Sequence, residues 1–587
     1  MTRLTNDPKR FAADALRGFT LAHSDYVQGV HGGVVRSTES PRGQVALVLG
    51  GGSGHYPAFA GWVGPGFAHG AACGNVFASP AASQVYSVAR AAESGGGVLL
   101  GFGNYAGDVL HFGQAAEMLR AEGIDVRVLT VSDDIASNSP EQHSDRRGIA
   151  GDLLVLKIAG AAAERGDDLD AVEAIGRRAN ERTRSLGVAF GGCTLPGASE
   201  PLFTVPDGTM ALGLGIHGEP GISQQDLGTA EAVADLLVEG VLAEEPERGA
   251  GGYEGRAAVL LNGLGDTKYE ELFVVYARVA ERLDEAGITV VAPQVGEQVT
   301  SLDMAGLSLS VTFLDPELEA CWTAPADTPA FRTGSMAPRE RRADVVELGG
   351  AGPARADEIA SGAPDSQRLA AMATSVLGAM ASTAEASERF LGDLDALAGD
   401  GDHGQGMVLG TSAARSAAEE ALARGAGIRT LLARAGEAWS ENAGGTSGAL
   451  WGAALVATGA ALTDDGGASS AEIVAAVDAG VSAVLDRGGA SVGDKTMVDA
   501  LVPFVDRLKE SHARGLPLSE AWRLGAAAAT DAAAETARIA ARRGRARTHG
   551  EQSLGHPDPG ATSFALLMTA AAEKLTNPAT TLAGAES

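Results

Sequence analysis

The chain has 587 residues, of which 45% are hydrophobic and 20% charged, and its formal net charge is −30. Because single cores stop growing at about 250–300 residues, this length predicts two or three domains, and the acidic charge argues against a partner such as duplex nucleic acid, which requires basic surfaces. Widely spaced cysteines without a disulfide or zinc pattern, no signal peptide and no run of about 18 apolar residues favour a cytoplasmic protein without a membrane span.

Short apolar segments that end in glycine or polar residues alternate with alanine-rich segments in the first half of the chain. Val45–Leu49, Val98–Phe102 and Val126–Val131 are predicted strands, and Ala81–Glu93 and Gln114–Glu122 are predicted helices. This alternation indicates a parallel α/β sheet. Ligands of such sheets bind at the carboxyl ends of the strands, where the glycine-rich segments lie.

A second α/β block is predicted further along, from strands and one helix at Arg256–Leu261, Ile288–Ala292, Leu307–Leu314 and Glu270–Ala286. A helix over Leu153–Arg184 and the glycine-rich stretch Gly187–Gly197 are expected to join the two blocks. The two blocks are predicted to form one domain of residues 1–322, with subdomains of about 1–190 and 191–322.

Proline, alanine, glycine and charged residues dominate residues 323–366, and we expect an interdomain linker there. Short Gly/Asp loops then separate alanine-rich stretches, which predicts an all-helical barrel domain over residues 367–577 with its chemistry confined to the loops. The predicted helical stretches are Arg368–Ser387, Val408–Arg424, Ile428–Glu441, Ala471–Asp486, Ser519–Arg543 and Ser563–Leu575.

The loop after the first of these stretches carries three carboxylates, Asp395, Asp400 and Asp402. Glycines allow the loop to turn tightly and bring the carboxylates together, where their charges repel unless a divalent cation neutralises them. Mg²⁺ prefers oxygen ligands and usually retains substrate phosphates as partners. The loop therefore predicts a magnesium site for a phosphate-bearing substrate, with an acidic helix cap as the alternative.

Further loops of the second half suit a nucleotide. Gly444–Gly448 offers backbone N–H groups and hydroxyls, expected at a helix N-terminus, as a phosphate cradle, and Gly493–Met497 adds a second polar turn. A basic cluster precedes Asp558–Gly560, and a cation there could stabilise a phosphate during transfer; it consists of Arg542, Arg543, Arg545 and Arg547. Taken alone, a glycine-rich loop is usually an ordinary turn, and an arginine cluster is usually a solvated helix face.

The motifs of the second half, and the order in which they follow along the chain, resemble those of the ATP-binding domain of dihydroxyacetone kinases. The first half resembles the ketose-binding domain of the same family at Gly50–His55, Cys73–Pro80, Asn104–Leu110 and Gly215–Gly221. The resemblance covers nearly the whole chain outside the expected linker. It implies a single-chain enzyme that takes phosphate from free ATP and forms a homodimer.

The resemblance also implies roles in the first half. A histidine equivalent to His217 adds its ring nitrogen to the substrate carbonyl and forms a hemiaminal, which selects ketones over polyols and holds a very small substrate. Asp108 would accept the proton of the attacking terminal hydroxyl, and His55 would orient and polarise the ketose. Backbone groups of the preceding loop would approach the substrate at Gly52, Ser53 and Gly54.

In the second half, the resemblance implies that Asp395, Asp400 and Asp402 bind Mg²⁺ ions that bridge the ATP phosphates. Phosphoryl transfer would then rest on positioning and charge neutralisation. The residues expected to line the nucleotide are His403, Gly404, Gln405, Gly406, Met407, Thr446, Ser447, Gly493, Thr496, Met497, Arg545, Asp558, Pro559 and Gly560.

The sequence departs from the family pattern at Tyr56, Asn75, Gly103 and Gly406, where glutamate, aspartate, lysine, and asparagine or threonine are usual. Loss of the lysine at Gly103 removes a donor and is expected to open volume beside the substrate. We therefore expect a four-carbon ketose such as erythrulose to be used as well as, or better than, dihydroxyacetone. Two alternatives stay open: a ketose- or nucleotide-sensing regulatory protein without turnover, and an FAD-AMP lyase activity that cyclises its substrate at the ATP site.

Overall fold

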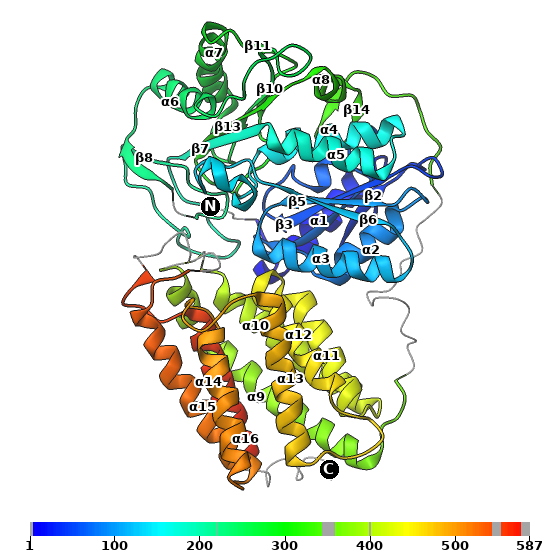
Figure 1. The fold of residues 1–587 in the computed structure, drawn as a ribbon, viewed down its shortest axis with the longest axis vertical. Helices are drawn as coiled ribbons and strands as arrows, with labels where there is room; N and C mark the ends of the chain where they lie inside the picture. The colour runs from blue at the N-terminus through cyan, green and yellow to red at the C-terminus, as the bar shows by residue number, and fades with distance from the viewer. Residues whose placement is uncertain are drawn as a thin grey trace. The chain divides into compact units, whose positions relative to one another are not determined.

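The computed structural model describes residues 4–219, 221–342, 359–397, 399, 401–542 and 553–576. The chain divides into two compact units, Met1–Ala354 and Arg355–Ser587 (Figure 1). The first unit combines α/β layers, and the described part of the second unit is all helical. The helices of the described segments include none that is long and apolar enough to cross a membrane.

The first sheet of the first unit has the strand order β1-β2-β4-β3-β5-β6. Strands β4, β3, β5 and β6 are parallel, as predicted, and β1 and β2 add an antiparallel hairpin at one edge. The bounds are β1 Val27–Val30, β2 Gly33–Arg36, β3 Ala46–Ser53, β4 Gly70–Val76, β5 Val98–Gly103 and β6 Val126–Val131.

Alternating side chains of the central strands bury both faces of this sheet. Val48 and Leu100 pack with α2 and α3, whereas Leu47 and Leu99 pack with α4 and α5. The helices and 3₁₀ turns of this region are Pro8–Arg10, α1 Phe11–Ala22, Ala60–Trp62, α2 Ala82–Ala92, α3 Ala106–Ala121, Pro140–Asp145, α4 Gly151–Arg165 and α5 Leu169–Glu181.

The single helix predicted over Leu153–Arg184 is wrong, and so is the joining role of Gly187–Gly197. Gly166 adopts a left-handed φ of 93° and ends α4, and Asp168 caps α5 by accepting a hydrogen bond from a backbone N–H. Strand β7 (Thr183–Ala189) follows and lies inside the second sheet, so that sheet begins before the subdomain boundary expected near residue 190.

The second sheet has the order β11-β10-β13-β7-β8-β9, with β12 beside β10. Most of its pairs are antiparallel, which corrects the expectation of parallel α/β layers throughout the first half. Helices α6 and α7 cover one face. The bounds are β8 Thr209–Leu212, β9 Ser223–Asp226, α6 Ala230–Leu242, β10 Arg256–Gly263, α7 Tyr269–Glu285, β11 Thr289–Val290, β12 Gln294–Gly296 and β13 Gly306–Phe313.

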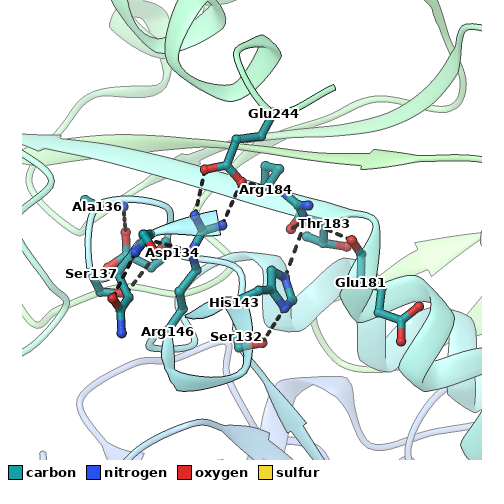
Figure 2. A network of polar contacts seen from close by, with 12 residues as sticks. Ser132, Asp134, Ala136, Ser137, His143, Arg146, Glu181, Thr183, Arg184 and Glu244 are labelled. Atoms are coloured by element: carbon teal, nitrogen blue, oxygen red, sulfur yellow. Dashed lines mark hydrogen bonds and ion pairs between the residues drawn. The ribbon is translucent and has the colours of Figure 1, made fainter. Parts of the chain in front are cut away.

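A polar network ties the loop after β6 to the second sheet (Figure 2). Arg146 is fully buried and donates two hydrogen bonds to Glu244, at 2.6 and 2.8 Å, and Arg184 donates a third at 2.7 Å. Arg184 also donates to His143 Nε2 at 3.4 Å, which requires a neutral imidazole. Burial and the two arginine charges accordingly lower the pKa of His143 to about 4.

The expected linker over residues 323–366 is too wide at both ends. After α8 (Pro316–Thr323), the chain forms the hairpin β14 (Ala326–Asp327) and β15 (Arg332–Thr333). Phe331 of this hairpin is buried in the core of the first unit, and Arg339 forms an ion pair with Glu164 of α4. Sequence composition missed this segment because its few apolar residues have no regular period, yet several of them are buried.

The helices of the second unit run in alternating directions, and each packs on the next (Figure 1). The last helix packs on the first, which closes the barrel around an apolar cavity of about 220 Å³. Pro503 within α14 and the glycine-rich start of α12 hid these two helices from the sequence pattern. The bounds are α9 Pro364–Asp395, α10 His403–Ala423, α11 Ile428–Ala443, α12 Gly445–Ala460, α13 Ser470–Gly488, α14 Val498–Ala513, α15 Leu518–Glu535, a 3₁₀ turn at Thr536–Arg538, and α16 Pro559–Thr576.

Candidate active site

Two predicted site residues of the first unit lie directly beyond the carboxyl ends of neighbouring parallel strands. His55 follows β3, and Asp108 lies in the first turn of α3, which follows β5. Strands β3 and β5 are hydrogen-bonded neighbours, so their ends share one edge of the sheet. Both side chains are buried.

His217 lies in the loop between β8 and β9 of the second sheet and contacts His55, which follows β3 of the first sheet. The two Nε2 atoms are 3.1 Å apart, and the ring centroids are 4.9 Å apart at 80°. His55 Nδ1 lies 2.7 Å from the carbonyl oxygen of Thr300, and His217 Nδ1 lies 3.0 Å from Glu219 Oε1. The structure thus brings together the two histidines that sequence motifs placed far apart in the chain.

These contacts fix where the protons of the histidine pair lie. A carbonyl and a carboxylate only accept hydrogen bonds, so both Nδ1 atoms carry a proton. An Nε2–Nε2 contact of 3.1 Å then needs one further proton between the rings. In this arrangement Glu219 contacts Nδ1 of His217, while Nε2 of the same ring faces His55.

Glu219 holds His217 at two points, since it accepts from the backbone N–H and from Nδ1–H, each at 3.0 Å. Although burial opposes ionisation, the His217 imidazole and Arg147 hold the pKa of Glu219 well below its usual range. Arg147 in turn donates to Asp134 at 2.9 Å. Sequence reasoning assigned no role to Glu219, although a carboxylate two residues after a reactive histidine in a glycine-closed turn was a usable signal.

Glycine and aromatic residues shape the walls of this site. Phe77 stacks on His55 at 5.0 Å and meets His217 edge-on at 5.3 Å, and Tyr105 meets His217 edge-on at 4.8 Å. A Cβ on Gly52 would lie 2.8 Å from the backbone nitrogen of Ala78, so only glycine fits there. The predicted loop Gly52–His55 thus packs closely against the backbone of Phe77 and Ala78.

The expectation that Gly103 opens volume needs correction. A Cβ at this position would lie 3.2 Å from Asp152 Oδ2, 3.3 Å from the carbonyl oxygen of Gly148 and 3.4 Å from Tyr105 Cε2. The surroundings of Gly103 are therefore close, and two of the three groups are polar. With glycine at residue 103, no side chain lies against Asp152, Gly148 or Tyr105 from this position.

Alternating helix direction gathers the predicted nucleotide loops at one end of the barrel in the second unit. The loops precede α10, α12, α14 and α16, which all begin at that end (Figure 1). His403 Nε2 lies 2.9 Å from the hydroxyl of Ser563 and links α10 to α16. Thr446 and Ser447, in the first turn of α12, are placed at this end by the helix direction alone.

Asp395 and Asp402 of the predicted magnesium loop lie close together, while Asp400 lies outside the described residues. Burial and the charge of Asp395 raise the pKa of Asp402 to about 7. The described ranges contain no arrangement of three or more His, Cys, Asp or Glu side chains that could hold a metal ion. Two mutually repelling carboxylates nevertheless fit a divalent cation, which would neutralise them.

The other predicted nucleotide residues divide between loop and core. Gly404 packs against the backbone of α9, where a Cβ would lie 2.0 Å from the carbonyl oxygen of Glu388. Gln405 and Gly406 continue the first turn of α10, but Met407 is buried in the core and leaves only its backbone for a ligand. Arg545 lies outside the described residues, as do Arg543 and Arg547.

Lys495 joins two of the nucleotide loops and was not predicted as a site residue. It is buried, and its Nζ donates to the carbonyl oxygens of Thr536, Ser553 and His556 at 3.0, 2.7 and 2.7 Å. Asp499 accepts from the backbone N–H groups of Gly493 and Thr496. These contacts fix Gly493–Met497 beside the start of α16 at Asp558, Pro559 and Gly560.

Comparison with known proteins decides the family. Residues 17–330 match the Dak1 domain, and residues 397–573 match the DAK2 domain. The chain belongs to the dihydroxyacetone kinase family. L-erythrulose 1-kinase of Mycolicibacterium smegmatis is 59% identical over 583 residues, which cover 98% of this chain and 100% of that protein. D-erythrulose kinase of the same species is 52% identical over 579 residues, or 98% and 99% of the two chains.

A solved structure of this family extends over both units. The crystal structure of the dihydroxyacetone kinase from C. freundii in complex with AMP-PNP and Mg²⁺ is 32% identical, covers 97% of this chain and 99% of that chain, and gives a TM-score of 0.51. The predicted family, with both domains in one chain, is confirmed. The fold class of an α/β half followed by an all-helical half and the assignment as an ATP-dependent kinase are confirmed as well.

Proposed function

We propose that this protein uses Mg²⁺-ATP to phosphorylate the terminal hydroxyl of erythrulose, a four-carbon ketose, while His217 holds the sugar as a hemiaminal. The observation that carries the proposal is the 3.1 Å contact between the Nε2 atoms of His55 and His217, with Glu219 on Nδ1 of His217. The erythrulose kinases that resemble the chain over almost its full length support the size of the sugar.

Ketose capture follows from the positions of the protons. The rings part, His217 keeps its Nδ1 proton on Glu219, and its Nε2 lone pair attacks the C2 carbonyl carbon. The C=O π bond breaks, and its oxygen takes the Nε2 proton that His55 retains. His217 becomes an alkylated imidazolium balanced by Glu219, so the total charge of the site is unchanged.

Phosphoryl transfer then requires the bound sugar to present its terminal hydroxyl beside Asp108. Asp108 accepts the hydroxyl proton while that oxygen bonds to the γ-phosphorus and the bond from phosphorus to ADP breaks. Asp395 and Asp402, together with Asp400, would hold Mg²⁺, which neutralises phosphate charge when bound. His403, Gly404 and the loops before α12, α14 and α16 would position the nucleotide through backbone N–H groups.

Two variants test the two halves of the proposal separately. Intact-mass measurement with trapped erythrulose should show an adduct on the wild type and on Asp402→Asn, and none on His217→Ala. ADP release from Mg²⁺-ATP and erythrulose should be lost in both variants. An adduct that persists in His217→Ala removes the histidine from its role. A wild type that binds ketose without ADP release points to a sensor, and release of a cyclic flavin phosphate points to the lyase alternative.

A further inference from the structure

Two polar atoms beside the histidine pair are buried without a hydrogen-bond partner in the described part of the chain. They are Oδ1 of Asp152, a residue that is only 2% exposed, and the hydroxyl oxygen of Tyr105. Buried polar groups are almost always hydrogen-bonded, because a buried group without a partner loses its hydrogen bonds to water and gains none in the protein. Two such groups, both next to Gly103, therefore indicate a group that the protein binds there.

Both atoms belong to the surroundings of the reacting groups. The Tyr105 ring meets His217 edge-on at 4.8 Å. Asp152 lies at the start of α4, and burial together with the charges of Asp133 and Asp108 holds the pKa of Asp152 well above its usual range. Burial thus favours the protonated form of this carboxyl group, which can both donate and accept a hydrogen bond.

Gly103 connects the two groups. A Cβ on Gly103 would lie 3.2 Å from Asp152 Oδ2 and 3.4 Å from Tyr105 Cε2, so this position contacts both groups. Any side chain at this position would therefore begin in contact with both groups. Glycine at residue 103 adds no side-chain atoms against either group.

We propose that Asp152 and Tyr105 form a subsite that hydrogen-bonds the hydroxymethyl group by which a four-carbon ketose exceeds dihydroxyacetone. This inference rests on the proposed function and names the residues that set its substrate size. A small polyhydroxylated ketone fits the observation because its hydroxyl, like the two protein groups, both donates and accepts. Dihydroxyacetone, which is one carbon shorter, leaves the subsite unfilled.

The test compares kcat/KM for erythrulose and for dihydroxyacetone in single variants. Tyr105→Phe removes one oxygen without adding volume, and Asp152→Leu replaces the carboxyl group by an apolar group of similar size. Loss of one or two hydrogen bonds to substrate should lower the erythrulose-to-dihydroxyacetone ratio by about fivefold in the first variant and by at least about tenfold in the second. Asp152→Asn, which still donates and accepts, should restore most of the ratio.

Tyr253→Phe is the matched control, because its hydroxyl is buried in the same unit but donates to Glu245 at 2.8 Å. It should leave the ratio unchanged. An equal loss for both ketoses in Tyr105→Phe and Asp152→Leu, or no change in either, overturns the subsite and leaves the kinase proposal intact. If Asp152→Leu does not fold, Tyr105→Phe alone decides. A wild type that forms no ketose adduct refutes the proposed function, and the subsite falls with it.

Discussion

Glu219→Gln isolates the contribution of the carboxylate behind His217. The wild-type carboxylate accepts from the backbone N–H and from Nδ1–H of His217, each at 3.0 Å. A glutamine has one accepting oxygen, so its NH₂ group must face one of these two donors. Losing one charge-assisted hydrogen bond to a buried group costs about 2–3 kcal/mol, and the positive charge on the alkylated His217 also loses its counter-charge.

We therefore expect Glu219→Gln to lower kcat/KM for the ketose by about 30- to 150-fold, since about 1.4 kcal/mol corresponds to tenfold. KM for ATP should stay close to the wild-type value, and the fraction of chain that carries a ketose adduct should fall in intact-mass spectra. Glu244→Gln is a matched control, because Glu244 accepts three arginine hydrogen bonds away from the histidines. A Glu219→Gln enzyme within threefold of wild type in kcat/KM would refute the proton assignment.

Two further perturbations test contacts outside the histidine pair. Lys495→Met leaves three inward-facing carbonyl oxygens without their donor, so the unfolding free energy of the second unit should fall by about 3–5 kcal/mol in denaturant titrations. A change below about 1 kcal/mol would contradict a stabilising role for the three Lys495 hydrogen bonds. The pKa of His143 is lowered to about 4, so its stabilisation is complete above pH 6.5 and is lost as the pH falls toward 4. His143→Gln should flatten the fall in stability over this window by about 1–2 kcal/mol, a value reduced because the ring is partly exposed, and an unchanged slope would exclude His143 as its source.

The sequence indicated the bounds of β5 and β6 well because buried parallel strands are continuous apolar runs. It ended the predicted Val45–Leu49 four residues before the end of β3 at Ser53, and it did not indicate β1, β2 or β4. Val126–Val131 was predicted with the observed bounds, and the predicted Val98–Phe102 differs by one residue from β5. The antiparallel pairing of the second sheet could not be predicted, because it depends on the topology of the chain. Strand β7 pairs antiparallel with β13, more than a hundred residues away, and no local pattern encodes the direction of such a partner.

The site was predictable where function leaves short motifs and hidden where it depends on three-dimensional proximity. His55, Asp108 and His217 each follow a glycine-rich segment, which marked them in the sequence. Asp152 carries no such mark, since an aspartate in the first turn of a helix is the ordinary complement to the helix dipole. Only its burial, its lack of a partner among the described residues and its contact with Gly103 distinguish it from a cap.

The position of Gly103 shows how a lost side chain can create specificity without creating space. The backbone of Gly148 and the carboxyl group of Asp152 already border the volume next to its Cα. A lysine there, as is usual in the family pattern, would supply its own donor but would cover Asp152 and could form an ion pair with it. With glycine, burial still raises the pKa of the Asp152 carboxyl group, and no cation at residue 103 opposes this shift. In the proposed subsite, discrimination between three- and four-carbon ketoses would depend on a hydrogen bond to the Asp152 carboxyl group, which is a larger effect than the fit of one methylene.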